Sequence, residues 1–156
     1  MNIAIDARMY GVAQRGIGRY LQKLIEALEV VDMRNHYTIF LRRANWDEYA
    51  PRNPNFKKAL WDAPWYGLRE QLTTYYILRT NADLYHFPHW NIPLLFNRPF
   101  IVTIHDLELF SSNRSRESST RGHLMYYLKR LTFKVVFRHA VLAARASPAT
   151  RVARSA

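Results

Sequence analysis

Three glycines near the start of the chain have spacing that could bind a phosphate. Gly11 and Gly16 have the spacing that opens a P-loop, but Ile17 stands where such a loop needs lysine. Gly16 and Gly18 similarly open a dinucleotide-binding fingerprint, but Leu21 replaces its third glycine. Neither nucleotide signature is complete.

What remains is a glycine-containing segment, residues 11–18, directly ahead of a helix. Such glycines let a ligand approach the backbone, and the free N–H groups of the first helical turn favour an anion such as a diphosphate. The alternative is a plain strand-to-helix turn, which needs glycine only for its backbone angles. Both interpretations stay open at this point.

His105 and Asp106 follow an apolar run and form the second set. A histidine at the end of a buried strand can lie in a cleft, where its protonation is tunable near neutral pH. It could act as a base or donate a hydrogen bond to a substrate hydroxyl or carbonyl. Alternatively, His105 bonds nearby backbone and Asp106 caps a turn.

The third set is His86, His89, Trp90 and Asn91. Two histidines three residues apart suggest a metal, but the spacing matches no zinc motif, and a strand would point them to different faces. The hypothesis is therefore that no metal is held here. A wall for a sugar or another polar ring suits these residue types better. An aromatic-rich loop packed on the core is the alternative.

Strands and helices alternate along the chain around these residues. Short apolar or β-branched runs predict strands at the following places: residues 2–6, 36–41, near 58–61, 83–87 and 100–104. A stripe of Ile17, Leu21, Leu24 and Leu28 predicts a helix after the glycine segment.

A second helix is expected over 67–79, with Leu68, Leu72 and Tyr75 as its apolar stripe. The alternation predicts an α/β fold, a Rossmann-like parallel sheet with flanking helices. Ligands of such sheets bind beyond the carboxyl ends of the strands. Since residues 11–18 and 105–106 both follow strands, we expect them to share one crevice.

The net charge of +11 is concentrated in the last third of the chain. Residues 1–110 hold 13 Lys and Arg against 11 Asp and Glu, whereas residues 111–156 hold 10 against one. A basic, leucine-striped helix over 121–142 could lie on an anionic membrane surface, bind nucleic acid nonspecifically, or simply be solvated. No base-reading motif is evident. The Ala/Arg-rich residues 143–156 have no apolar period and are expected to be a disordered tail behind a domain over 1–142.

Composition excludes several classes of protein. The 49% hydrophobic and 14% aromatic content excludes a disordered chain. The absence of cysteine excludes thiol nucleophiles, disulfides and Cys-ligated metals. No apolar run is long enough to span a membrane, and the first residues do not have the basic start of a secretory signal. We therefore expect a cytoplasmic protein whose contact with a membrane, if any, is peripheral.

Four segments, in this order, resemble the N-terminal domain of family 4 glycosyltransferases of the GT-B fold. The resemblance covers about residues 1–140, and the segments are Ile3-Ala-Ile-Asp-Ala-Arg8, Gly16-Ile-Gly-Arg-Tyr20-Leu, Asp83-Leu-Tyr-His-Phe-Pro88 and Ile101-Val-Thr-Ile-His-Asp-Leu107. It implies retaining transfer of a sugar from a nucleotide diphosphate sugar to a glycan or lipid-linked acceptor. It implies no bound metal or other cofactor.

The resemblance also implies roles for individual residues. The catalytic pair would be His105 and Asp106, with His105 contacting the donor sugar. The donor diphosphate would lie against Gly16, Ile17, Gly18 and Arg19. The acceptor side would be formed by Arg8, His86, His89, Trp90 and Asn91, together with a loop over 111–120.

The sequence departs from this family after the basic helix. The family continues into a second domain that binds the nucleotide, whereas here a biased tail ends at Ala156. We therefore expect a truncated or out-of-frame product that needs a missing donor domain or partner chain and is inactive alone. The alternative is a non-catalytic acceptor- or membrane-binding module that acts with a partner chain.

Overall fold

Short runs rich in apolar and β-branched residues build a parallel sheet at the centre of the molecule. A computed structural model describes residues 1–64, 68–89, 92–93 and 96–105. Within these ranges the sheet has five strands in the order β3-β2-β1-β4-β5, all parallel. The strands are β1 (Asn2–Asp6), β2 (His36–Leu41), β3 (Phe56–Leu60), β4 (Leu84–Phe87) and β5 (Phe100–Val102). The fold is therefore Rossmann-like α/β, as the sequence predicts.

The central strand β1 fixes the register of its neighbours. Ile5 lies opposite Ile39 of β2 and His86 of β4. Ala4 and Ile5, which point to opposite faces, are both buried. Burial on two faces is the environment in which a continuous apolar run forms a strand of a parallel sheet.

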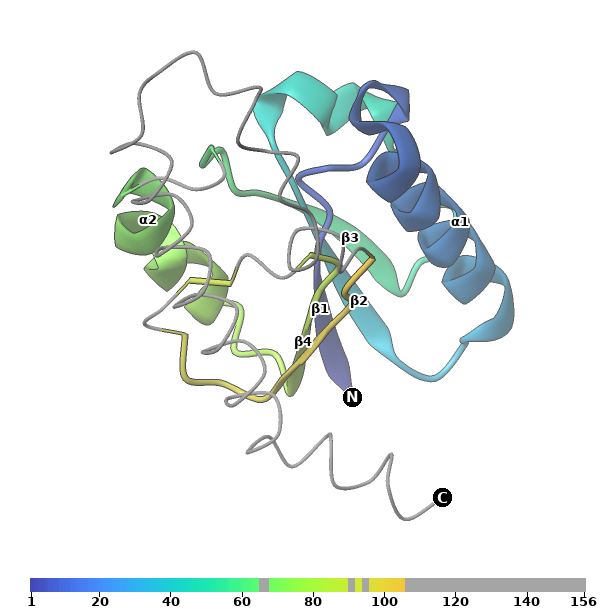
Figure 1. Cartoon of the computed structure of the whole chain (residues 1–156). Coiled ribbons are helices and arrows are strands. Elements are labelled where there is room, and N and C mark those ends of the chain that lie inside the picture. Colours follow the sequence, from blue (N-terminus) through green and yellow to red (C-terminus); the bar gives the residue numbers. More distant parts are fainter. Residues whose placement is uncertain (65–67, 90–91, 94–95, 106–156) are drawn as a thin grey trace.

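Among the described residues, α-helices lie on both faces of the sheet (Figure 1). Helix α1 (Arg15–Val31) packs Leu21 and Ile25 against the face that carries Ile5 and Ile39. Helix α2 (Leu68–Leu78) lies on the other side, where Ile77 joins Tyr85 of β4 in a second apolar cluster. The result is the helix–sheet–helix layering typical of parallel α/β folds.

Helical structure occurs in two segments for which the sequence analysis predicts none. A short 3-10 helix, η1 (Val12–Gln14), and then α1 from Arg15 occupy most of the segment expected to be a loop over 11–18. A second 3-10 helix, η2 (Arg43–Glu48), lies between β2 and β3, where the sequence analysis names no element. In η2, the Asn45 side chain donates to the carbonyl oxygens of Ala7, Arg8 and Tyr10, which fixes the loop after β1.

The apolar stripe expected on the second helix is wrong. Leu72 is 76% exposed and Tyr75 is 49% exposed, whereas Glu70, Thr74 and Ile77 are buried. Glu70 turns inward because Arg8 provides a buried positive partner for its carboxylate. The polar contact, rather than the leucine period, therefore sets which face of α2 meets the sheet.

Several predicted features lie outside the described residues. They are Trp90, Asn91, Asp106, the loop over 111–120, the basic helix over 121–142 and the tail over 143–156, with the domain boundary between the last two. None of the helices in the described ranges is long and apolar enough to cross a membrane.

A close backbone contact seats the start of α1 on the loop that follows β1. A Cβ atom at Gly18 would lie 1.9 Å from the carbonyl oxygen of Gly11 and 3.0 Å from that of Met9. Backbone atoms cannot swing aside as a side chain does, so only glycine fits. Gly16, two residues earlier, has nothing within 4 Å of the same position.

This difference predicts opposite effects of the same substitution at two positions of one helical turn. Gly18→Ala should lower the free energy of unfolding by at least about 2 kcal/mol, because the added methyl group overlaps the Gly11 carbonyl. Gly16→Ala should raise it by about 0.5 kcal/mol, because alanine favours the helix and meets open space. Urea unfolding of both variants measures the pair, and equal effects at the two positions would contradict this packing.

Candidate functional site

Polar side chains gather where β1, β4 and β5 end. Arg8 lies in the loop after β1, His86 lies in β4, and Thr103 and His105 follow β5. The backbone N–H of Thr103 donates to the carbonyl oxygen of Phe87 (2.9 Å), which extends the pairing of β4 and β5 by one step. Because the sheet is parallel, these groups share its carboxyl edge, where ligands of such folds bind.

A chain of hydrogen-bonding groups crosses from this edge to α1. The His86 Nε2 atom lies 2.9 Å from the Thr103 hydroxyl oxygen, which lies 3.3 Å from the Tyr20 hydroxyl oxygen. His86 is buried, and Tyr20 belongs to the second turn of α1. The chain therefore joins β4, the end of β5 and α1 through three side chains.

Tyr20 also contacts His105 directly. The two ring centroids are 4.6 Å apart and the ring planes meet at 72°, an edge-to-face arrangement. His105 itself is exposed. This contact brings the first turns of α1 and the imidazole after β5 to the same side of the sheet.

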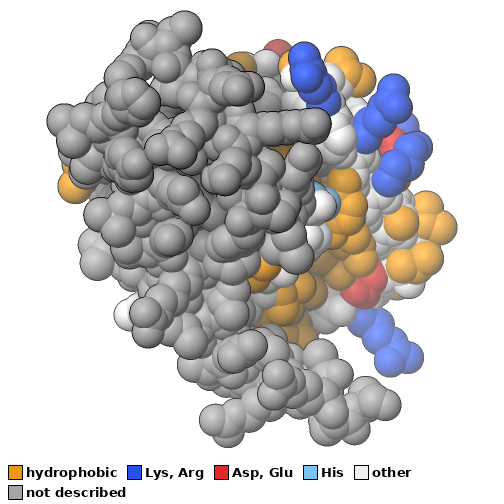
Figure 2. Space-filling view, in the orientation of Figure 1, with side chains coloured by type: hydrophobic (Ala, Val, Ile, Leu, Met, Phe, Trp, Pro, Cys, Tyr) orange, Lys and Arg blue, Asp and Glu red, His pale blue; other side chains and the backbone are white. Residues whose placement is uncertain are grey.

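The start of α1 has the properties of an anion-binding surface. Among the described residues, no side chain caps its N-terminus by a hydrogen bond. The N–H of Arg15 donates to the Val12 carbonyl oxygen of η1. The other N–H groups of a first helical turn have no partners within the helix, and the helix dipole places partial positive charge there. Arg15, Arg19 and Lys23 are exposed, and Figure 2 shows Lys and Arg side chains over this end of α1.

The four residues predicted to contact a diphosphate therefore occupy a helical turn. Gly16 and Arg19 are exposed, Ile17 is partly buried, and Gly18 faces the Gly11 backbone. A ligand at this turn would meet the open side of Gly16 and the Arg19 guanidinium, whereas Gly18 serves the packing of the helix.

Arg8, predicted on the acceptor side, lies in the interior and is 2% exposed. Its Nη2 atom donates to the carboxylates of Asp6 (2.8 Å) and Glu70 (2.6 Å), and its Nη1 atom donates to the Ala63 carbonyl oxygen (3.1 Å). The guanidinium carbon lies 3.5 Å from the centre of the Trp61 ring. These contacts tie the end of β1 to α2 and leave Arg8 with a structural position below the surface.

The carboxylates of Asp6 and Glu70 stabilise the charged form of Arg8. Burial lowers the pKa of Arg8, but Asp6 and Glu70 together raise it above its ordinary value. One cation thus faces two carboxylates. Removing the cation would leave those carboxylates uncompensated in the interior, which is far more costly than removing an exposed ion pair.

The two histidines of the third predicted set are held neutral. Burial lowers the pKa of His86 to about 4 and that of His89 to about 4. In both cases Asp6 acts in the opposite direction, and His105 lowers the pKa further. Both side chains therefore share the neighbourhood of Asp6 and His105.

Over the described ranges, no group of three or more His, Cys, Asp or Glu side chains is arranged to hold a metal ion. His86 already uses its Nε2 atom in the contact with Thr103.

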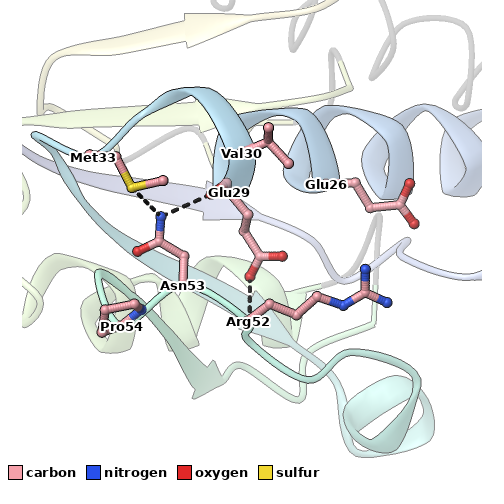
Figure 3. Close-up of a pocket in the computed structure, with 7 residues that line it drawn as sticks. All are labelled: Glu26, Glu29, Val30, Met33, Arg52, Asn53 and Pro54. Carbon is pink, nitrogen blue, oxygen red and sulfur yellow. Dashed lines mark hydrogen bonds between the residues drawn. The ribbon is translucent and has the colours of Figure 1, made fainter.

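A separate pocket of about 200 Å³ lies at the other end of α1 (Figure 3). Its lining comes from the last turns of α1 and the loop before β3: Glu26, Glu29, Val30, Met33, Arg52, Asn53 and Pro54. The carboxylate of Glu29 accepts a hydrogen bond from the backbone N–H of Arg52 (3.0 Å). Tyr20 lies nine residues before Glu29, about 14 Å along the helix axis at 1.5 Å per residue, so this pocket is not part of the site.

The structure thus brings His86, His89 and His105 into one neighbourhood, where Tyr20 of α1 contacts His105, and it buries Arg8 near His89. Trp90, Asn91 and Asp106 lie outside the described residues. Sequence reasoning missed Tyr20 and Thr103. Tyr20 is four residues after Gly16 in α1 and so shares a helix face with it. Thr103 and His105 follow β5, where the strand period no longer applies, so spacing gave no signal for Thr103.

Comparisons of this chain with protein-family models, with curated proteins and with solved structures found no match.

The low pKa values predict acid sensitivity of the fold. Unfolded histidine has a pKa near 6.5 and folded His86 about 4, so the unfolded state binds more protons between these values. The free energy of unfolding should therefore fall as the pH is lowered through this window, by about 3 kcal/mol at most for His86, and level off below it.

Urea unfolding at several pH values between 4 and 7 measures this dependence, and His86→Gln is the control because it keeps a polar nitrogen near Thr103. The variant should show a shallower loss of stability below pH 6.5 than the parent chain. Parallel curves for the two chains would contradict a buried, neutral His86.

Proposed function

We propose that this chain is the acceptor-side domain of a glycosyltransferase that moves a sugar from a nucleotide diphosphate sugar to a glycan or lipid-linked acceptor. The observation that supports the proposal most is the contact of Tyr20 with His105. This contact links the second turn of α1, directly after exposed Arg19, to the exposed imidazole of His105. The ordered resemblance of four segments to family 4 glycosyltransferases adds the substrate class.

The chemistry of sugar transfer uses these groups in a consistent way. Departure of a nucleoside diphosphate develops negative charge on its phosphate oxygens. Backbone N–H groups and a helix dipole aimed at that charge stabilise it without reorganising. Arg19 would add a full positive charge, and His105 would donate or accept a hydrogen bond at a sugar hydroxyl.

The neutral histidines suit the acceptor side of such a site. At neutral pH, His86 and His89 carry no charge. His86 is buried and bonded to Thr103, so the partly buried His89 would be the one of the two to meet an uncharged sugar. Polar rings of this kind fit a carbohydrate, whose hydroxyl groups need oriented donors and acceptors. In the proposed protein, the nucleotide would be held by a second domain, as in the family that the sequence resembles.

Titration of the ¹⁵N-labelled chain with pyrophosphate and with a nucleoside diphosphate tests this function. The amide signals of residues 16–19 and the ring signals of His105 should shift together and saturate, with orthophosphate binding more weakly. Arg19→Gln should weaken the binding several-fold, because a cation is lost beside the helix start. Arg52→Gln, at the remote pocket, is the matched control and should leave it unchanged. The proposal fails if the diphosphate moves other signals only, or if both variants bind equally.

A further inference from the structure

We propose that Tyr20 is a positioning residue that holds the His105 imidazole in its orientation, and that Tyr20 is itself anchored by Thr103. This inference deepens the proposed function and rests on it only for the use of His105 at the reacting sugar. The contacts that carry it are independent of any substrate.

The first step is the exposure of His105. The residue follows β5, where the last strand pairing ends, and its side chain is exposed. An exposed imidazole ordinarily samples several rotamers. A group that must meet a reacting atom within a few tenths of an ångström needs a neighbour that restricts this freedom.

The second step is the geometry of Tyr20. Its ring packs against the imidazole with centroids 4.6 Å apart, at an angle of 72°. Edge-to-face aromatic pairs attract each other beyond the effect of their buried area, enough to favour one rotamer over others by several-fold. Among the described aromatic contacts, this is the one that reaches His105.

The third step is the anchor of Tyr20 itself. Its hydroxyl lies 3.3 Å from the Thr103 hydroxyl, whose other neighbour is the Nε2 atom of buried His86 at 2.9 Å. A hydroxyl has one proton to donate, so the proton position on Thr103 links the Tyr20 hydroxyl to the tautomer of His86. The neutral state of His86, set by burial, keeps this link in place at neutral pH. Tyr20 is therefore held at both its ring and its hydroxyl.

Nuclear magnetic resonance of the histidine side chains in the full chain tests the proposal. Tyr20→Leu should move the His105 ring signals to those of a freely rotating, exposed histidine. Tyr20→Phe keeps the ring and should leave His105 closer to the parent, while it changes the ¹⁵N signals that report the His86 tautomer. Thr103→Val should move both His86 and His105, because it removes the anchor of Tyr20. A role confined to stability would leave the His86 tautomer unchanged in Tyr20→Phe.

The control is Tyr75→Leu, which removes an exposed ring of α2 that is stacked on Tyr76 and should leave both histidines unchanged. Unmoved His105 signals in Thr103→Val would overturn the proposal, even if Tyr20→Leu does not fold. The histidine signals are measured without sugar or nucleotide, so they test the positioning role of Tyr20 alone. A failed diphosphate titration would instead overturn the proposed function and leave the positioning role standing.

Discussion

The close approach of helix α1 to the loop after β1 is the constraint on which the site depends. Gly18 permits it, because any Cβ at that position would overlap the carbonyl oxygen of Gly11. With the helix seated so closely, Tyr20 reaches both Thr103 and His105, which follow β5. A helix displaced by the width of a methyl group would lose these contacts, since hydrogen bonds weaken within tenths of an ångström.

Below this surface, a buried charge cluster fixes the elements that frame it. Arg8 connects Asp6 at the end of β1 with Glu70 in the first turn of α2, where a carboxylate also suits the helix dipole. The same Asp6 carboxylate raises the pKa values of His86 and His89, but burial has the larger effect and keeps both values low. The charged cluster around Arg8 and the neutral histidines His86 and His89 are therefore neighbours at one edge of the sheet.

Local sequence patterns were enough to predict the sheet, and not enough to predict the finer site. The run over 36–41 matches β2 because side-chain alternation and β-branching act locally. The face of α2 could not be predicted from leucine spacing, since the partner of Glu70 is 62 residues away in the chain. For the same reason the buried ion pairs of Arg8 and the contact of Tyr20 with His105 were not predicted. Such pairings are set by tertiary packing, which residue spacing alone does not contain.

The central claim is that the second turn of α1 and the imidazole after β5 lie side by side at the carboxyl edge of the sheet. Nuclear Overhauser contacts between the aromatic protons of Tyr20 and the ring protons of His105 measure this most directly. The structure, with ring centroids 4.6 Å apart, predicts strong cross-peaks between the two rings in the full chain at neutral pH. Their absence, with cross-peaks from His105 to residues on the α2 side of the sheet instead, would contradict the account.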